Sequence, residues 1–190
     1  MPISSQSVVV LSILLLGSAL FSRRTYAACS FRAIFNFGDS NSDTGVSGPP
    51  SRQHGPFGIT FFKRPTGRAS DGRLVIDFLA QTIGLPFLSP YLQSIGSSFK
   101  HGANFATLAS TVLPPNTSLF ISGISPFYLG VQLNQMKELR DKVLHMSSQA
   151  NLPSHEIFRQ ALYTIDIGQN DFTSNLASIG IGGAVPSSSG

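Results

Sequence analysis

The sequence of 190 residues has few charges, one cysteine and no tryptophan. Charged residues make up 12% of the chain and hydrophobic residues 42%, a balance that excludes an intrinsically disordered protein. The single cysteine, Cys29, excludes a disulfide-stapled miniprotein and a zinc site built from several cysteines. The net charge is +4, but the basic residues are scattered and match no zinc-finger or recognition-helix motif. We therefore expect no nucleic-acid partner.

The N-terminal segment has the features of a secretory signal peptide. Residues 8–21 are almost entirely apolar, and this stretch is too short for a transmembrane helix, which needs about 20 residues. Small side chains at Thr25 and Ala27 fit a cleavage site after Ala27. The sequence therefore predicts a signal peptide over 1–27, secretion to the extracellular space and no stable membrane span. The alternative interpretation is a buried N-terminal helix.

Two further features fit a secreted protein. Asn116 begins an Asn-Thr-Ser glycosylation acceptor, and the two prolines before it predict an accessible loop. Cys29 would be the second residue after cleavage, and this sequence holds no second cysteine to pair with it. An odd cysteine in an oxidising compartment suggests that its disulfide partner lies elsewhere.

Alternating strand and helix patterns indicate an α/β protein. The apolar run over 31–37 is broken by Gly38 and predicts a buried strand. Asp71 is predicted to cap a helix over 72–83, and the clearest helical spacing covers 131–146. Further predicted elements are strands over 103–108 and 162–167 and a short helix over 154–160. This order predicts an α/β sandwich with a mostly parallel sheet.

The first and last predicted strands run into polar turns, GDSN at 38–41 and GQND at 168–171. In open parallel sheets, ligands bind outside the carboxyl ends of the strands. A serine on a tight turn becomes a nucleophile once a base takes its proton, and a carboxamide is an uncharged donor for an oxyanion. Ser40 and Asn170 are therefore candidate catalytic residues. The alternative interpretation is two ordinary polar turns.

Four blocks of the sequence resemble, in family order, the shared blocks of the plant secreted GDSL-type serine esterases, also called SGNH hydrolases. The blocks are FNFGDSNSDTG (35–45), GRASDGRLVIDFLAQTIGLP (67–86), HGANFATLAS (101–110) and YTIDIGQNDF (163–172). The resemblance is close to the branch related to early nodulin and fucosidase-like proteins. It implies an SGNH-hydrolase-like three-layer sandwich, with the N-terminal part of that domain over 28–181 and an irregular tail over 182–190.

The resemblance also implies a role for each matching residue. Ser40 would be the nucleophile and would lend its backbone N–H to the oxyanion hole. Asn170 would donate its side-chain amide to the same oxygen. The family's further donor is the backbone N–H of a glycine, and Ala109 occupies that position here. Gly102 is a weaker candidate for this role, because it precedes the strand.

The family's general base is a histidine in an Asp-x-x-His block near the C-terminus, and this sequence has no such block. We expect surface or packing roles for its four histidines, which are His54, His101, His145 and His155. We interpret Asp39 and Asp171 as turn formers rather than catalytic acids. The family's members are longer, so we expect a chain truncated before the base and its aspartate.

The sequence thus predicts the N-terminal half of a secreted hydrolase of carboxylic esters that acts through an acyl-enzyme. The resemblance implies no metal and no organic cofactor. The expected substrate is a small ester, either an acyl lipid or an acetylated sugar. The alternative, favoured by the missing histidine, is a non-catalytic secreted remnant that binds ester or glycan ligands.

Overall fold

The computed structural model describes residues 30–45, 57–93, 95–115, 125–146 and 150–175. Residues 1–30 and residues 31–190 form two separate units, and the described helices and strands belong to the second. Several sequence predictions lie outside the described residues, namely the signal peptide, Cys29, His54, Asn116 and the tail over 182–190.

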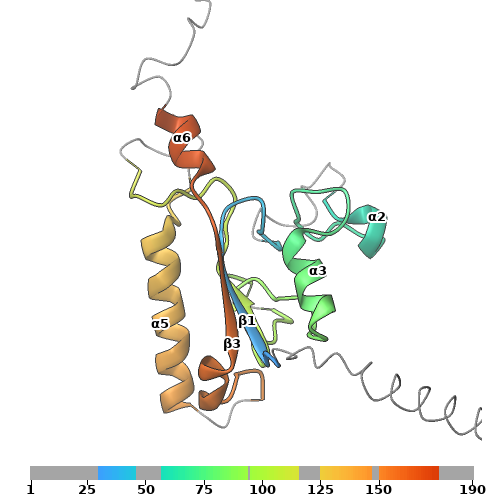
Figure 1. The fold of residues 1–190 in the computed structure, drawn as a ribbon, viewed down its shortest axis with the longest axis vertical. Helices are drawn as coiled ribbons and strands as arrows, with labels where there is room; N and C mark the ends of the chain where they lie inside the picture. The colour runs from blue at the N-terminus through green and yellow to red at the C-terminus, as the bar shows by residue number, and fades with distance from the viewer. Residues whose placement is uncertain (1–29, 46–56, 94, 116–124, 147–149, 176–190) are drawn as a thin grey trace, which may run out of the picture. The chain divides into compact units, whose positions relative to one another are not determined.

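A three-stranded parallel sheet lies at the heart of the described fold (Figure 1). Strand β1 (Ala33–Gly38) lies between β2 (Gly102–Asn104) and β3 (Ala161–Asp166). All six residues of β1 are buried, because a central parallel strand is covered on both faces. The predicted strands over 31–37 and 162–167 are therefore confirmed, and the sheet is parallel as predicted.

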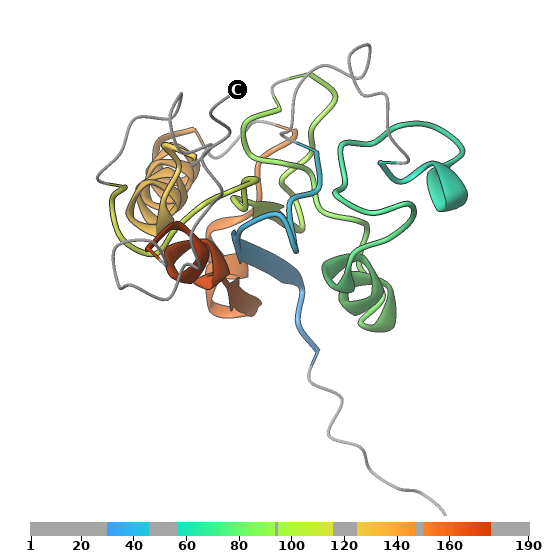
Figure 2. The same ribbon diagram turned by 90° about the horizontal axis from the view of Figure 1, so that it is seen from above.

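Helices cover both faces of this sheet (Figures 1 and 2). Helix α5 (Leu129–His145) lies on one face, where Phe35 shares a core cluster with Leu139. Helix α3 (Val75–Thr82) lies on the other, where Ile34 packs against its apolar side. Successive side chains of a strand point to opposite faces, so β1 contributes to both clusters. The described elements form the three layers that the sequence predicts.

The start of α3 differs from the prediction of a helix over 72–83 capped by Asp71. The helix begins at Val75, and the carboxylate of Asp77 accepts the backbone N–H of Leu74 at 2.9 Å. The same carboxylate forms a bidentate ion pair with buried Arg68, and both N–O distances are 2.7 Å. The cap is therefore set by a residue inside the helix, because the guanidinium holds that carboxylate in place.

Other elements also depart from the sequence pattern. The strand predicted over 103–108 ends at Asn104, although two later backbone N–H groups still bond to β1. The helix predicted over 154–160 is the 3₁₀ helix η2 (His155–Arg159). Helices α2 (Ile59–Phe62) and α6 (Gln169–Asn175) were not predicted. Because only two residues lie between the end of β3 and Gln169, where α6 starts, the predicted GQND turn is largely the first turn of a helix.

Within the described ranges, no helix has the length and apolar character needed to cross a membrane.

Candidate active site

The carboxyl ends of the three strands bring Ser40, Ala109 and Asn170 to one edge of the sheet. Ser40 lies two residues beyond β1, and Asn170 lies in the first turn of α6, which follows β3. The segment after β2 stays beside β1, because Thr107 donates its backbone N–H to Gly38 at 3.2 Å. All three candidate residues are half-buried, so each keeps some access to solvent.

The side chain of Asn170 links the two loops that carry the other candidates. Its Nδ2 donates to the backbone carbonyl of Ser110 at 2.8 Å and to Oδ2 of Asp39 at 3.4 Å. Ser110 directly follows Ala109, and Asp39 directly precedes Ser40. One carboxamide therefore spans the turn after β1 and the turn after β2.

Among the backbone donors at this edge, those of both candidate loops include N–H groups without a partner in the part of the chain that the structure describes. The N–H groups of Ser40 and Ala109 are among them. Their neighbours are bonded, since Asn41 donates to Oδ1 of Asp39 at 3.0 Å and Leu108 donates to Oδ2 of Asp43 at 2.9 Å. Half-exposed N–H groups that the fold leaves unpaired are able to hold an anionic oxygen.

Ala109 adopts a backbone conformation that normally belongs to glycine. Its φ is +60°, in the left-handed region, where a Cβ costs about 1–2 kcal/mol. Its carbonyl accepts the backbone N–H of Ser125 at 3.0 Å, which helps to hold the turn in this conformation. The chain therefore keeps the left-handed turn although it carries alanine where the resemblance implies glycine.

Gly102, the weaker candidate donor, lies at the other end of the sheet from Ser40. It is the first residue of β2, and its φ is +104°. A Cβ there would lie 1.8 Å from the carbonyl oxygen of Ile34, so strand packing explains the glycine.

The two aspartates interpreted as turn formers bond to backbone N–H groups. Asp39 is fully buried and holds the turn through Asn41, whereas Asp171 accepts the N–H groups of Val112 and Leu113 at 2.7 and 3.1 Å. Burial raises the pKa of Asp39; the Asn41 N–H lowers it, and nearby carboxylates raise it further. Both carboxylates thus shape the loops around Ser40.

The described histidines lie at the opposite end of the sheet from Ser40. His101 directly precedes β2, where its Nδ1 lies 3.2 Å from the carbonyl of Arg32, and His155 begins η2, which directly precedes β3. His145 ends α5, thirteen residues beyond Gln132, whose side chain bonds to Gly38. That helical separation is about 20 Å at 1.5 Å per residue.

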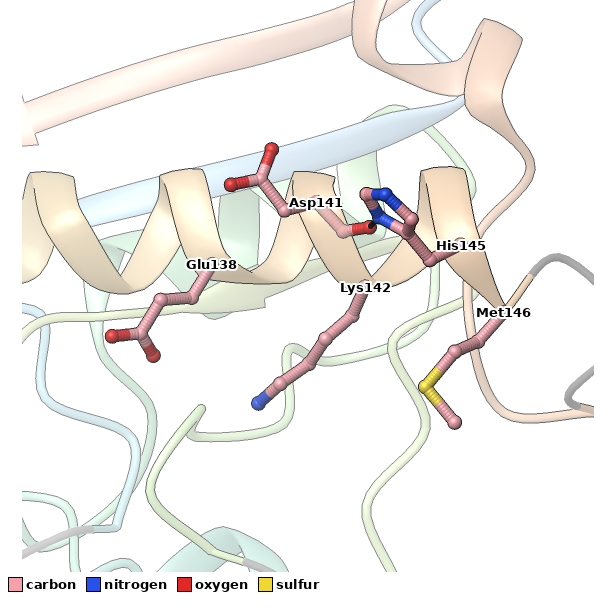
Figure 3. Close-up of a pocket in the computed structure, with 5 residues that line it drawn as sticks. All are labelled: Glu138, Asp141, Lys142, His145 and Met146. Carbon is pink, nitrogen blue, oxygen red and sulfur yellow. Dashed lines mark hydrogen bonds between the residues drawn. The ribbon is translucent and has the colours of Figure 1, made fainter.

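Figure 3 shows the surroundings of His145, which form a shallow hollow on the exposed side of α5. Its lining residues are Glu138, Asp141, Lys142, His145 and Met146. Nδ1 of His145 lies 2.7 Å from the backbone carbonyl of Asp141, one helical turn earlier. The His145 ring therefore makes its hydrogen bond within the last turn of its own helix. Among the described residues, no group of three or more His, Cys, Asp or Glu side chains could hold a metal ion.

Sequence reasoning missed the buried polar residues beneath the site. Asn104 donates to the carbonyl of Ser42 at 2.6 Å and to Oγ1 of Thr44 at 2.8 Å, and it accepts the side-chain amide of Asn36 at 2.7 Å. Both asparagines lie within apolar strand patterns, FNF and ANF. A polar residue inside an apolar strand pattern is the sequence feature that could have indicated these buried asparagines.

The chain matches known proteins over most of its length. The family model of the GDSL-like lipase/acylhydrolases covers residues 34–188. A GDSL esterase/lipase of Arabidopsis thaliana is 63% identical over 169 residues, which are 85% of this chain and 44% of that protein. An esterase of Hevea brasiliensis is 45% identical over 185 residues, 93% of this chain and 46% of that protein.

A third relative, named alpha-L-fucosidase 3 and also from Arabidopsis thaliana, is 51% identical over 151 residues. These residues are 76% of this chain and 41% of that protein. The chain thus spans about half the length of the curated relatives it matches.

Proposed function

Because the chain belongs to the GDSL-like lipase/acylhydrolase family, we propose that it forms the N-terminal part of a hydrolase that cleaves carboxylic esters through Ser40. One observation carries this proposal. Ser40 and Ala109 lie at one sheet edge with the Asn170 carboxamide, and their backbone N–H groups have no partner among the described residues, so these groups supply the donors that ester attack requires.

In the proposed reaction, a base takes the hydroxyl proton of Ser40 while Oγ attacks the ester carbonyl carbon. The carbonyl oxygen becomes an oxyanion and accepts hydrogen bonds from the N–H groups of Ser40 and Ala109 and from the amide of Asn170. The oxyanion collapses to an acyl-enzyme and the alcohol leaves with a proton from the base. Water then attacks the acyl group, which releases the acid and restores Ser40.

The amide of Asn170 is held in a way that suits this role. Its bond to the Ser110 carbonyl is 2.8 Å long and fixes the orientation of the side chain. Its contact with Asp39 is 3.4 Å long, and an oxyanion would replace it at little cost. Such contacts are often loose before substrate binds and tighten in the transition state.

We propose that the general base comes from outside residues 1–190. None of the four histidines of the sequence stands in an Asp-x-x-His block. The three that the structure describes lie at the amino ends of the strands, remote from Ser40. The chain also spans about half the length of its curated relatives, so a longer protein has room for the base and its aspartate.

We also propose that the protein is secreted, with a signal peptide over 1–27 and a glycan on Asn116, as the sequence features predict. Its substrate is a small ester, either an acyl lipid or an acetylated sugar. Glycoside hydrolysis would need two carboxyl groups that face the substrate. Asp39 is fully buried and Asp171 bonds to two backbone N–H groups, which among the described residues leaves Asp166 as the exposed carboxylate near Asp39 and argues against a facing pair.

Ester turnover by the full-length protein containing residues 1–190 tests this proposal. We expect hydrolysis of p-nitrophenyl acetate, and we expect Ser40→Ala to lower kcat by several orders of magnitude because the catalytic residues act as a unit. Ser42→Ala is the matched control: its buried hydroxyl lies two residues away and has no hydrogen-bond partner among the described residues.

The control variant should keep the parent's kcat. A Ser40→Ala variant that retains kcat within about tenfold of the parent would refute the nucleophile assignment. Hydrolysis of p-nitrophenyl α-L-fucoside that survives Ser40→Ala would instead indicate glycoside chemistry in another part of the protein.

A further inference from the structure

A buried carboxamide lies directly behind the turn that carries Ser40. Gln132 belongs to the first turn of α5, and its side chain has no exposed surface. Its Oε1 accepts the backbone N–H of Gly38 at 2.9 Å, and its Nε2 donates to the carbonyl of Gly38 at 2.8 Å. The same Nε2 donates to the carbonyl of Phe127 at 3.0 Å. Both amide hydrogens are therefore used.

This carboxamide takes the place of a missing strand partner. Gly38 is the last residue of β1, and on the β3 side it is in register with Asp166. On the other side β2 has already ended at Asn104, and Thr107 supplies a single bond to the Gly38 carbonyl. The side chain of Gln132 satisfies the Gly38 N–H, which would otherwise be buried and unpaired.

The contact between Gln132 and Phe127 also links Gln132 to the loop that carries Ala109 and Ser110. The carbonyl of Phe127 also accepts the hydroxyl of Ser110 at 2.8 Å. Ser110 directly follows Ala109, and its own carbonyl receives the Asn170 amide. A chain of part-buried hydrogen bonds therefore runs from Gln132 through Phe127 and Ser110 to Asn170, and Ser110 is the covalent neighbour of Ala109.

We propose that Gln132 is a positioning residue for the nucleophile, holding the Ser40 turn in register with the loop that carries Ala109. It contacts neither the substrate nor the reacting atoms and acts through the backbone of Gly38. The proposal rests on the proposed ester hydrolysis for its catalytic consequence. A displacement of about 1 Å in a reacting group lowers rates by about 100-fold, so this register matters for kcat.

Gln135 provides a matched control on the same helix. It lies three residues after Gln132 and is also buried, with 8% of its surface exposed. Unlike Gln132, its Oε1 has no hydrogen-bond partner among the described residues. The same substitutions are made at both buried residues, but only the change at Gln132 breaks bonds to Gly38 and Phe127.

The experiment compares Gln132→Asn and Gln132→Met with Gln135→Asn and Gln135→Met in the full-length protein. Asparagine keeps the amide but is one methylene shorter, so it provides a second variant if methionine prevents folding. Three readouts are taken: hydrogen–deuterium exchange of residues 36–44, kcat and KM for p-nitrophenyl acetate, and the thermal midpoint. A merely structural role predicts that activity follows the thermal midpoint in all four variants.

We expect both Gln132 variants to exchange faster over 36–44 and to lower kcat by about 10- to 100-fold, with KM within about twofold of the parent. The Gln135 variants should match the parent in exchange and kcat. Gln132→Asn with parental exchange and kcat would overturn the proposal, as would a loss of kcat equal to that of Gln135→Asn. A parent without ester turnover refutes the proposed function alone; exchange over 36–44 then decides whether Gln132 holds the turn.

Discussion

The two ends of the parallel sheet differ in whether their backbone N–H groups have hydrogen-bond partners. At the amino end, Arg32 donates to Gln160, Ile34 donates to His101, and Gly102 packs against β1 with no space for a side chain. At the carboxyl end, the N–H groups of Ser40 and Ala109 are left without partners among the described residues. Backbone groups at the amino end are thus paired within the chain, whereas the carboxyl end leaves these two donors without a partner among the described residues.

The largest effect expected from this contrast is at Asn170, at the carboxyl end. In the full-length protein, Asn170→Ala should lower kcat by about 10²–10³ with little change in KM, the scale for one lost oxyanion donor. The measurement is steady-state hydrolysis of p-nitrophenyl acetate. The control is His145→Ala at the far end of α5, which should leave kcat unchanged because its ring nitrogen lies against the Asp141 carbonyl of its own helix.

Equal losses of kcat in Asn170→Ala and His145→Ala would contradict the proposed difference between the two ends of the sheet. An effect of Asn170→Ala confined to KM would point to substrate positioning rather than transition-state stabilisation. A thermal melt of each variant separates both outcomes from simple unfolding, since Asn170 also ties Ser110 to Asp39.

A smaller effect is expected from the strained turn at Ala109. Ala109→Gly relieves about 1–2 kcal/mol of left-handed strain, while extra freedom in the unfolded chain offsets about 0.4–1 kcal/mol. We therefore expect the free energy of unfolding, measured in urea, to rise by about 1 kcal/mol. Ala106→Gly is the control: this buried alanine does not have a positive φ, so the change should lower stability. A loss of stability in Ala109→Gly would contradict the left-handed turn.

The smallest expected effect concerns the buried carboxyl of Asp39. Burial raises its pKa in the folded protein above the ordinary value of 3.8, so folding favours the protonated form. Its contribution to stability is therefore complete below about pH 3.8 and is lost as the pH rises through the raised pKa. Asp39→Asn should gain stability relative to the parent over that window, as urea unfolding at a series of pH values would reveal. A stability difference that is constant with pH would contradict the raised pKa.

Local patterns in the sequence predicted the elements that depend on local physics. The apolar run of β1, the LYTIDI strand and the helical spacing of α5 all appear close to their predicted positions. The cap of α3 was predicted wrongly, because Asp77 is fixed by Arg68, nine residues earlier. The polar turns at the strand ends made Ser40 and Asn170 candidates, but such turns are ordinary by themselves. Only the resemblance gave these two residues their roles and pointed to Ala109.

The sequence by itself determined the α/β class, the mostly parallel sheet and the polar residues that follow the strands, because hydrophobic period and glycine breaks act over a few residues. The tertiary structure alone decided which polar groups meet. Gln132 reaches Gly38 across 94 residues, and Asn170 reaches Ser110 across 60. No local pattern encodes such pairs: they form because parallel strands place their carboxyl ends together and buried N–H groups require partners there.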